Sequence, residues 1–61
     1  MDETITFTDL DDGTESLVIV RAVPGGVALA ISKEADGDVE VFMPTDLVER
    51  VASALRAAAA C

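Results

Sequence analysis

The side chains of this sequence that could do chemistry are carboxylates, and they gather in two short clusters. The first spans residues 9–15. It fails the spacing of the helix–loop–helix calcium motif, which needs oxygen ligands at positions one, three and five, glycine at six and glutamate at twelve. Counted from Asp9, Gly13 falls at the fifth position and Val20 at the twelfth. The second cluster spans residues 34–40. We interpret both as solvated turns, with weak divalent binding as the alternative.

Nucleophilic and metal chemistry lacks its usual side chains. There is no histidine, and the one cysteine, Cys61, is the last residue. This composition excludes zinc sites of the usual kind, Ser–His and Cys–His catalysis, and an internal disulfide. Acid–base catalysis by paired carboxylates needs a pocket that holds them at a set separation, and 61 residues leave little volume for one. We therefore predict no enzyme, no cofactor and no metal site.

The net charge of the chain limits the classes of partner that it can bind. Twelve acidic residues oppose four basic ones, so the net charge is −8. Proteins that hold nucleic-acid phosphates or anionic membranes need a surplus of Lys and Arg, so we predict neither partner. The 51% hydrophobic content argues against disorder. The same charge supports an alternative function, an acidic inhibitor that imitates nucleic-acid charge and blocks a DNA- or RNA-binding protein.

Cellular location is predicted from the first residues. Met1, Asp2 and Glu3 lack the basic start and apolar run of a secretory signal. One cysteine cannot form the disulfides within the chain that stabilise small secreted domains. The expectation is a cytoplasmic protein, and the Ala-rich, Lys-poor composition is typical of a bacterial or phage chain.

Turn signals divide the chain into elements. Asp12-Gly13, Pro24-Gly25-Gly26 and Asp36-Gly37 supply the backbone freedom that hairpins need. The runs between them are rich in Val, Ile, Thr and Phe, so we predict strands at about 4–10, 16–23, 27–33 and 38–43. Apolar residues then recur every three or four positions, which predicts a helix over about 45–60. The predicted fold is a single α+β domain, residues 1–61: a four-stranded antiparallel β-meander followed by one C-terminal helix packed on one sheet face.

Two-residue turns would set the pairing of the strands. Turns at Asp12-Gly13, Gly25-Gly26 and Asp36-Gly37 place Ile5 opposite Val20, Val20 opposite Ile31, and Ile31 opposite Phe42. Lys33 would then oppose Glu40 as a cross-strand ion pair. The set predicted to lie under the helix is Ile5, Phe7, Val18, Val20, Ala22, Leu29, Ile31 and Phe42.

The second sheet face is then predicted to be apolar at its centre, which is unusual for an antiparallel sheet in a monomer. We expect it to be covered by another polypeptide, most simply a second copy of the chain. Arg21 has two interpretations: a side chain reaching water at the sheet border, or an interfacial residue pairing with a partner carboxylate. The residues predicted to form the interface are Ile19, Arg21, Ala28, Ala30 and Val41.

The order of four strands and a helix is similar to that of the positive-cofactor family of single-stranded-DNA-binding domains. The similarity extends to element order alone, because the basic and aromatic residues that hold backbone and bases have no counterpart here. The predicted function is that of a small acidic, non-catalytic interaction or assembly protein. It would self-associate, most simply as a homodimer, or bind a protein partner through its apolar sheet face.

Overall fold

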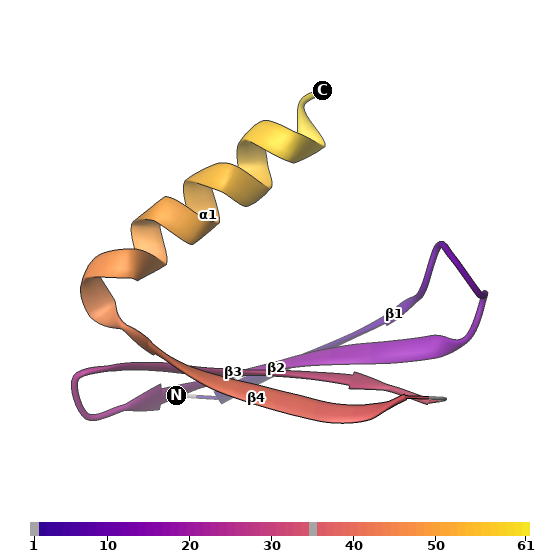
Figure 1. Cartoon of the computed structure of the whole chain (residues 1–61), viewed down its shortest axis with the longest axis horizontal. Coiled ribbons are helices and arrows are strands. Elements are labelled where there is room, and N and C mark those ends of the chain that lie inside the picture. The colour runs from indigo at the N-terminus through magenta and orange to yellow at the C-terminus, as the bar shows by residue number, and fades with distance from the viewer. Residues whose placement is uncertain (1, 35) are drawn as a thin grey trace.

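The computed structural model describes residues 2–34 and 36–61 and contains four strands and one helix. The strands are β1 (Asp2–Thr8), β2 (Glu15–Val23), β3 (Gly26–Lys33) and β4 (Gly37–Pro44), and the helix is α1 (Thr45–Ala59). They form one antiparallel sheet in the order β1-β2-β3-β4 (Figure 1). The predicted fold of a four-stranded antiparallel sheet followed by a C-terminal helix is confirmed.

The first hairpin has a longer loop than the sequence predicted. β1 ends at Thr8 because the Asp9 carboxylate accepts a hydrogen bond from the backbone N–H of Asp11 at 2.7 Å. The Asp12 carboxylate accepts from the N–H of Thr14 at 3.0 Å. Such side-chain-to-backbone bonds compete with strand pairing. Residues 9–14 are therefore loop, and Ile5 pairs with Val18 instead of Val20.

The second hairpin differs from its predicted register by the same amount. β2 ends at Val23, which pairs with Gly26, so the turn is Pro24-Gly25 and not Gly25-Gly26. Val20 consequently lies opposite Leu29. A shift of two residues leaves every side chain on its predicted face, because side chains alternate with a period of two.

The third hairpin changes faces, and here the predicted register is wrong. Lys33 pairs with Gly37, so an odd number of residues separates the paired positions where the prediction had an even number. Gly37 has a φ of 81°, in the left-handed region that glycine adopts without steric cost. The odd spacing moves every β4 side chain to the other face. Val41 pairs with Leu29, and Phe42 pairs with Ala28.

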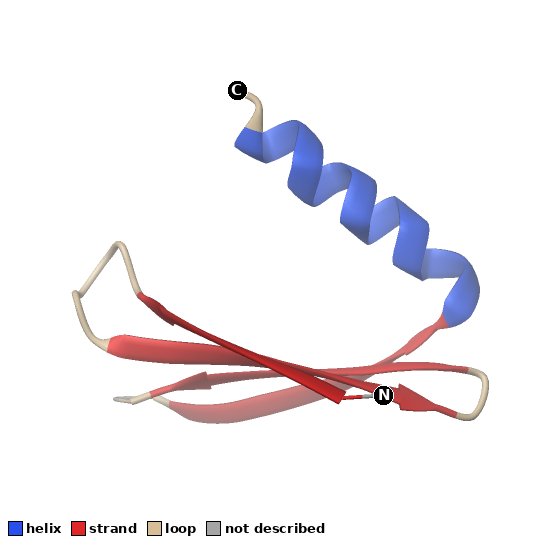
Figure 2. Cartoon of the chain, turned by 180° about the vertical axis from the view of Figure 1, so that it is seen from behind, coloured by secondary structure: helices blue, strands red, loops and turns tan. Residues whose placement is uncertain are grey.

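The helix α1 follows β4 directly. Pro44 is its N-cap residue with extended backbone, Asp46 lies in the first turn and Arg56 in the last, as suits the helix dipole. The helix lies on the β3–β4 side of the sheet and rises away from it toward its C-terminus (Figures 1 and 2). We call the sheet face on this side the helix-side face and the opposite one the far face.

Little of the described chain is buried. Among its residues only Ala28, with no exposed surface, and Ser16, with 2%, are buried. No described helix has the length and apolar character needed to cross a membrane.

Candidate interaction surface

An open apolar groove separates α1 from the sheet. Its floor is formed by residues of β2, β3 and β4, and its wall by the inward-facing residues of α1. All eight are apolar, so the groove has no polar side chain with which to orient a small-molecule substrate. The floor residues are Val20, Val27, Leu29 and Met43, and the wall residues are Val48, Val51, Ala52 and Leu55.

Large hydrophobic side chains stay exposed inside and around this groove. Leu55 on α1 is 68% exposed, Val39 on β4 is 65% exposed, and Ile5 on β1 is 49% exposed. Strand register puts Val39 and Ile5 on the same face as Leu29. The apolar surface therefore extends from the groove across the helix-side face. Exposed apolar patches of this extent mark interaction sites in monomeric proteins.

The predicted interface residues do not form one surface. Ile19, Ala28 and Ala30 lie on the far face, as predicted, but Ala28 is already fully buried within the chain. Val41 lies on the helix-side face, opposite Leu29, and its predicted place beside Ala28 is wrong. The same change of register puts Phe42, predicted to lie under the helix, on the far face, where it is 65% exposed.

Arg21 lies on the far face and pairs within the chain. Its Nη2 lies 2.8 Å from Oε2 of Glu40 on β4. This hydrogen bond and the charge of Glu40 raise the pKa of Arg21 above its usual value. Nearby, the Ser32 hydroxyl donates to the Asp38 carboxylate at 2.6 Å. Polar β4 side chains thus flank the small apolar centre of the far face, which is the ordinary pattern for a sheet with one solvated side.

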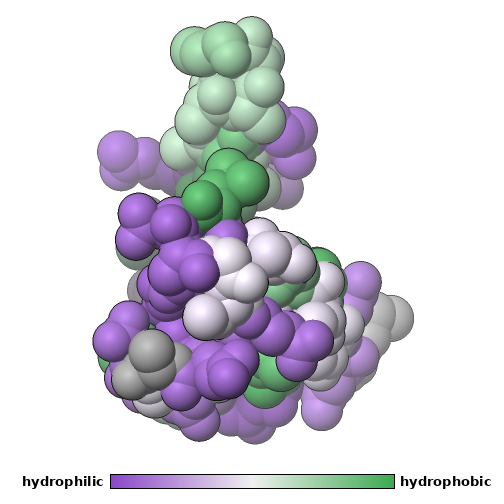
Figure 3. All heavy atoms as spheres, turned by 90° about the vertical axis from the view of Figure 1, so that its right-hand side faces the viewer, coloured by the Kyte–Doolittle hydropathy of each residue, from purple (hydrophilic) through white to green (hydrophobic). Residues whose placement is uncertain are grey.

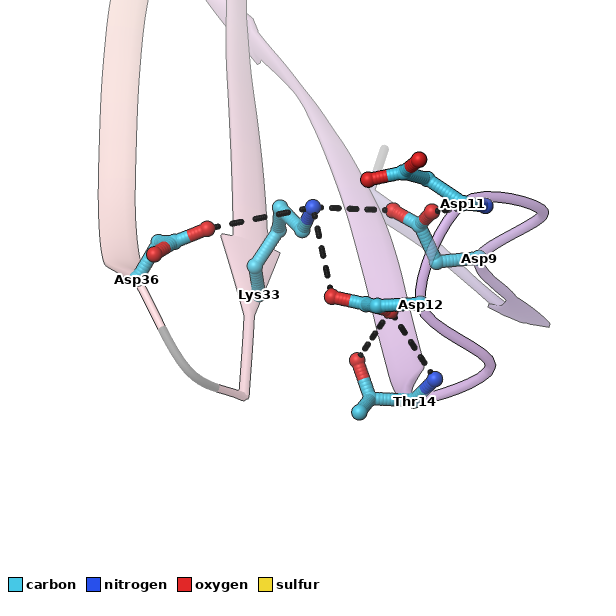
Figure 4. Close-up of polar contacts among 6 residues, drawn as sticks. All are labelled: Asp9, Asp11, Asp12, Thr14, Lys33 and Asp36. Carbon is cyan, nitrogen blue, oxygen red and sulfur yellow. Dashed lines mark hydrogen bonds and ion pairs between the residues drawn. The ribbon is translucent and has the colours of Figure 1, made fainter.

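The two acidic clusters meet at one end of the sheet. The β1–β2 loop and the β3–β4 turn lie at this end, which we call the acidic end (Figure 1). Lys33 lies between them (Figure 4): its Nζ is 3.1 Å from Asp9, 3.7 Å from Asp12 and 3.8 Å from Asp36. The predicted pair between Lys33 and Glu40 is wrong. Viewed from this end, hydrophilic residues cover most of the sheet, and the apolar helix projects above them (Figure 3).

Hydrogen bonds and Lys33 together hold this end in its charged form. The backbone N–H of Asp11 and then Lys33 lower the pKa of Asp9. The N–H and hydroxyl of Thr14, with Lys33, lower the pKa of Asp12. Asp9 and its neighbours in turn raise the pKa of Lys33. In residues 2–34 and 36–61 no group of His, Cys, Asp and Glu side chains has the arrangement of a metal site.

Ser16 is a buried polar residue that sequence reasoning missed. It lies on the helix-side face between its strand neighbours Phe7 and Lys33, and its hydroxyl makes no hydrogen bond to another described residue. The alternation of side chains along β2 predicts that Ser16 faces the helix side. A polar side chain among the apolar residues of that face is the feature of the sequence that could have identified it. Cys61 is exposed, and its thiol lies 3.5 Å from the carbonyl oxygen of Ala57.

Comparison with known protein families, with characterised proteins and with solved structures finds no match for this chain.

Proposed function

We propose that this chain is a small, non-catalytic interaction or assembly protein that binds another polypeptide through its helix-side face. The observation that carries the proposal is the exposure of large hydrophobic side chains along the groove and over the neighbouring strands. Removing this surface from water is favourable at roughly 25 cal/mol per Å². On the far face, which the sequence alone predicted as the interface, Phe42 is the one large hydrophobic side chain among the described residues that is exposed to a comparable extent.

The chemistry of the groove supports binding in preference to catalysis. Its lining is apolar, while the carboxylates of Asp9 and Asp12 lie in the β1–β2 loop and pair with Lys33. A catalytic carboxylate needs a pocket that shields and orients it. The cytoplasm is the compartment we propose, since a single cysteine makes no disulfide within the chain.

A second candidate function follows from the position of the acids. Two hairpins bring their carboxylates to the acidic end, where the net charge is strongly negative despite Lys33. An inhibitor of a DNA- or RNA-binding protein would place this end in a basic cleft, because opposite charge speeds and orients association. It would leave the helix-side face free.

Site-specific photo-crosslinking in the producing cells tests both candidates. Benzoylphenylalanine in place of Val39 reports on the helix-side face, in place of Asp11 on the acidic end, and in place of Thr6 on the far face. All three positions are exposed. We expect a covalent adduct with a polypeptide, either a second copy or another protein, from position 39 and none from position 6.

The pattern of adducts separates the outcomes. Adducts from position 11 alone would favour the acidic inhibitor. A position 39 that gives no adduct with any polypeptide would contradict the proposed function.

A further inference from the structure

The helix contacts the β3–β4 half of its own sheet face. Among the described residues, no α-carbon of α1 lies within 8 Å of an α-carbon of β1 or β2. Neighbouring strands are about 4.8 Å apart and a helix is about 10 Å wide, so one helix covers about two strands. A four-stranded sheet therefore needs two helices on this face. The uncovered half contains Ile5, 49% exposed, and Phe7, 43% exposed.

The chain has more surface than a folded monomer of its size. Its accessible surface is 4732 Å², whereas a monomer of 6.3 kDa is expected to have about 3,700 Å². Its radius of gyration is 12.7 Å, against about 10.5 Å for a compact chain of 61 residues. Both excesses arise because α1 rises from the sheet (Figure 2).

We propose that the second helix on this face comes from a second copy of the chain. This inference rests on the proposed function and names its partner. The excess surface of about 1,000 Å² per chain matches the roughly 800 Å² that each partner buries in a standard interface. In the dimer, the C-terminal half of α1 from each copy packs on the β1–β2 half of the other sheet. The exchange is reciprocal about a two-fold axis, as an isologous interface requires.

Side chains on the two surfaces agree with this exchange. Leu55, in the C-terminal half of α1, is 68% exposed and is available to the partner's Ile5 and Phe7. From Arg50 onward the charged side chains of the helix are both basic, Arg50 and Arg56. The β1–β2 half of the sheet ends in an acidic loop. The helix and the surface proposed to receive it are thus complementary in charge as well as apolar.

Sedimentation equilibrium across a dilution series tests the dimer. We expect twice the chain mass of 6.3 kDa at micromolar concentration. Ile5→Glu should reduce this to the chain mass with an unchanged circular dichroism spectrum, since Ile5 is half-exposed and α1 does not reach β1. Thr4→Glu is the matched control: it adds the same charge to the same strand but on the far face, and should stay dimeric.

An engineered disulfide tests the helix exchange without depending on how Ile5→Glu folds. Phe7→Cys and Leu55→Cys are combined in a Cys61→Ser chain. A disulfide needs α-carbons closer than about 7 Å, which α1 and β1 of one chain do not reach. We expect oxidation to give a covalent dimer that thiols reverse. Thr6→Cys replaces Phe7→Cys in the control, which should stay uncrosslinked.

Each result bears on a defined part of the inference. A wild-type chain with the monomer mass at high micromolar concentration overturns the dimer. A dimer that forms no Phe7–Leu55 disulfide, or that Ile5→Glu leaves intact while folded, overturns the helix exchange. An adduct between position 39 and a different protein in cells, together with a monomeric chain, would leave the proposed function standing while this inference failed.

Discussion

Lys33 shows how a single residue organises the acidic end. Three carboxylates from two separate hairpins lie within 4 Å of its Nζ. The sequence interpretation treated each acidic cluster as a solvated turn, and in the structure each is also tied to this ammonium group. The cation that these loops hold is therefore supplied by the chain itself.

Replacing this cation should have a pH-dependent effect. Asp9 and Asp12 have lowered pKa values in the folded chain, so their contribution to stability is complete above the ordinary carboxyl pKa of about 3.9. It is lost as the pH falls through the lowered values. We expect Lys33→Met to lower the free energy of unfolding at pH 7, and the difference from wild type to disappear in strong acid.

Urea unfolding of both proteins from pH 2 to pH 8 measures this difference. The raised pKa of Lys33 means that the contribution also declines above pH 10.5, when the ammonium deprotonates. Lys33→Arg keeps a positive charge at this position and is the control, and it should show a smaller effect. An effect of Lys33→Met that persists unchanged at pH 2 would mean that the ion pairs contribute nothing.

At the scale of elements, the third hairpin determines the character of both sheet faces. Its odd spacing moves Val39, Val41 and Met43 to the helix-side face. It also moves Glu40 to the far face, beside Arg21. The first two hairpins also differed from their predicted registers, but by two residues, so they kept their faces. Whether an odd or an even number of residues separates the paired positions, rather than the exact place of the turn, decides which sheet face is apolar.

The junction between the second turn and the start of α1 is tightly packed and can be tested at Gly26. A Cβ at Gly26 would overlap the Met43 carbonyl oxygen on β4. Backbone atoms there cannot move independently, because the Thr45 N–H donates to the Gly25 carbonyl at 3.3 Å. We expect Gly26→Ala to destabilise the fold by about 1–3 kcal/mol, as overpacking does, measured by urea unfolding.

The control for this variant is Gly37→Ala. A Cβ at Gly37 has no neighbouring atom within 4 Å, so its cost arises from the positive φ alone, about 1 kcal/mol. A Gly26→Ala protein as stable as wild type would contradict the close approach of β3 to the end of β4.

At the scale of the whole molecule, the small size of the chain means that its stability depends on association. A chain of about 60 residues buries only about 60% of its unfolded surface, and this one leaves α1 without a fully buried residue. Neither a disulfide nor a zinc ion of the usual kind is open to its composition. The chain can still be stabilised when a second chain covers its helix-side face.

Stability should consequently depend on protein concentration. When folding is coupled to dimer formation, each tenfold increase in concentration adds about 1.4 kcal/mol to the apparent stability of the dimer. We expect the urea midpoint of the wild-type chain to rise over a hundredfold concentration range, and that of Ile5→Glu to stay constant. A wild-type midpoint independent of concentration would show that the folded unit is the single chain.

The sequence by itself determined the elements and their order. Glycine and aspartate at the turns, β-branched runs between them and the three-to-four-residue apolar period after Pro44 are local signals, and each element forms where its own residues favour it. It also predicted that an apolar surface would be left uncovered. It could not place that surface, because a one-residue difference in a turn exchanges the two faces of a strand.

Only the tertiary structure decided which side chains share a surface. Three placements depend on strand register between residues distant in sequence: Val41 beside Leu29, Arg21 beside Glu40, and Lys33 between two hairpins. The angle at which α1 leaves the sheet is likewise absent from any local pattern: an amphipathic helix records which face is apolar but not how far it lies from the sheet. The distance between α1 and the sheet is set by packing between elements and not by the propensities of either one, so no local pattern predicts the open groove.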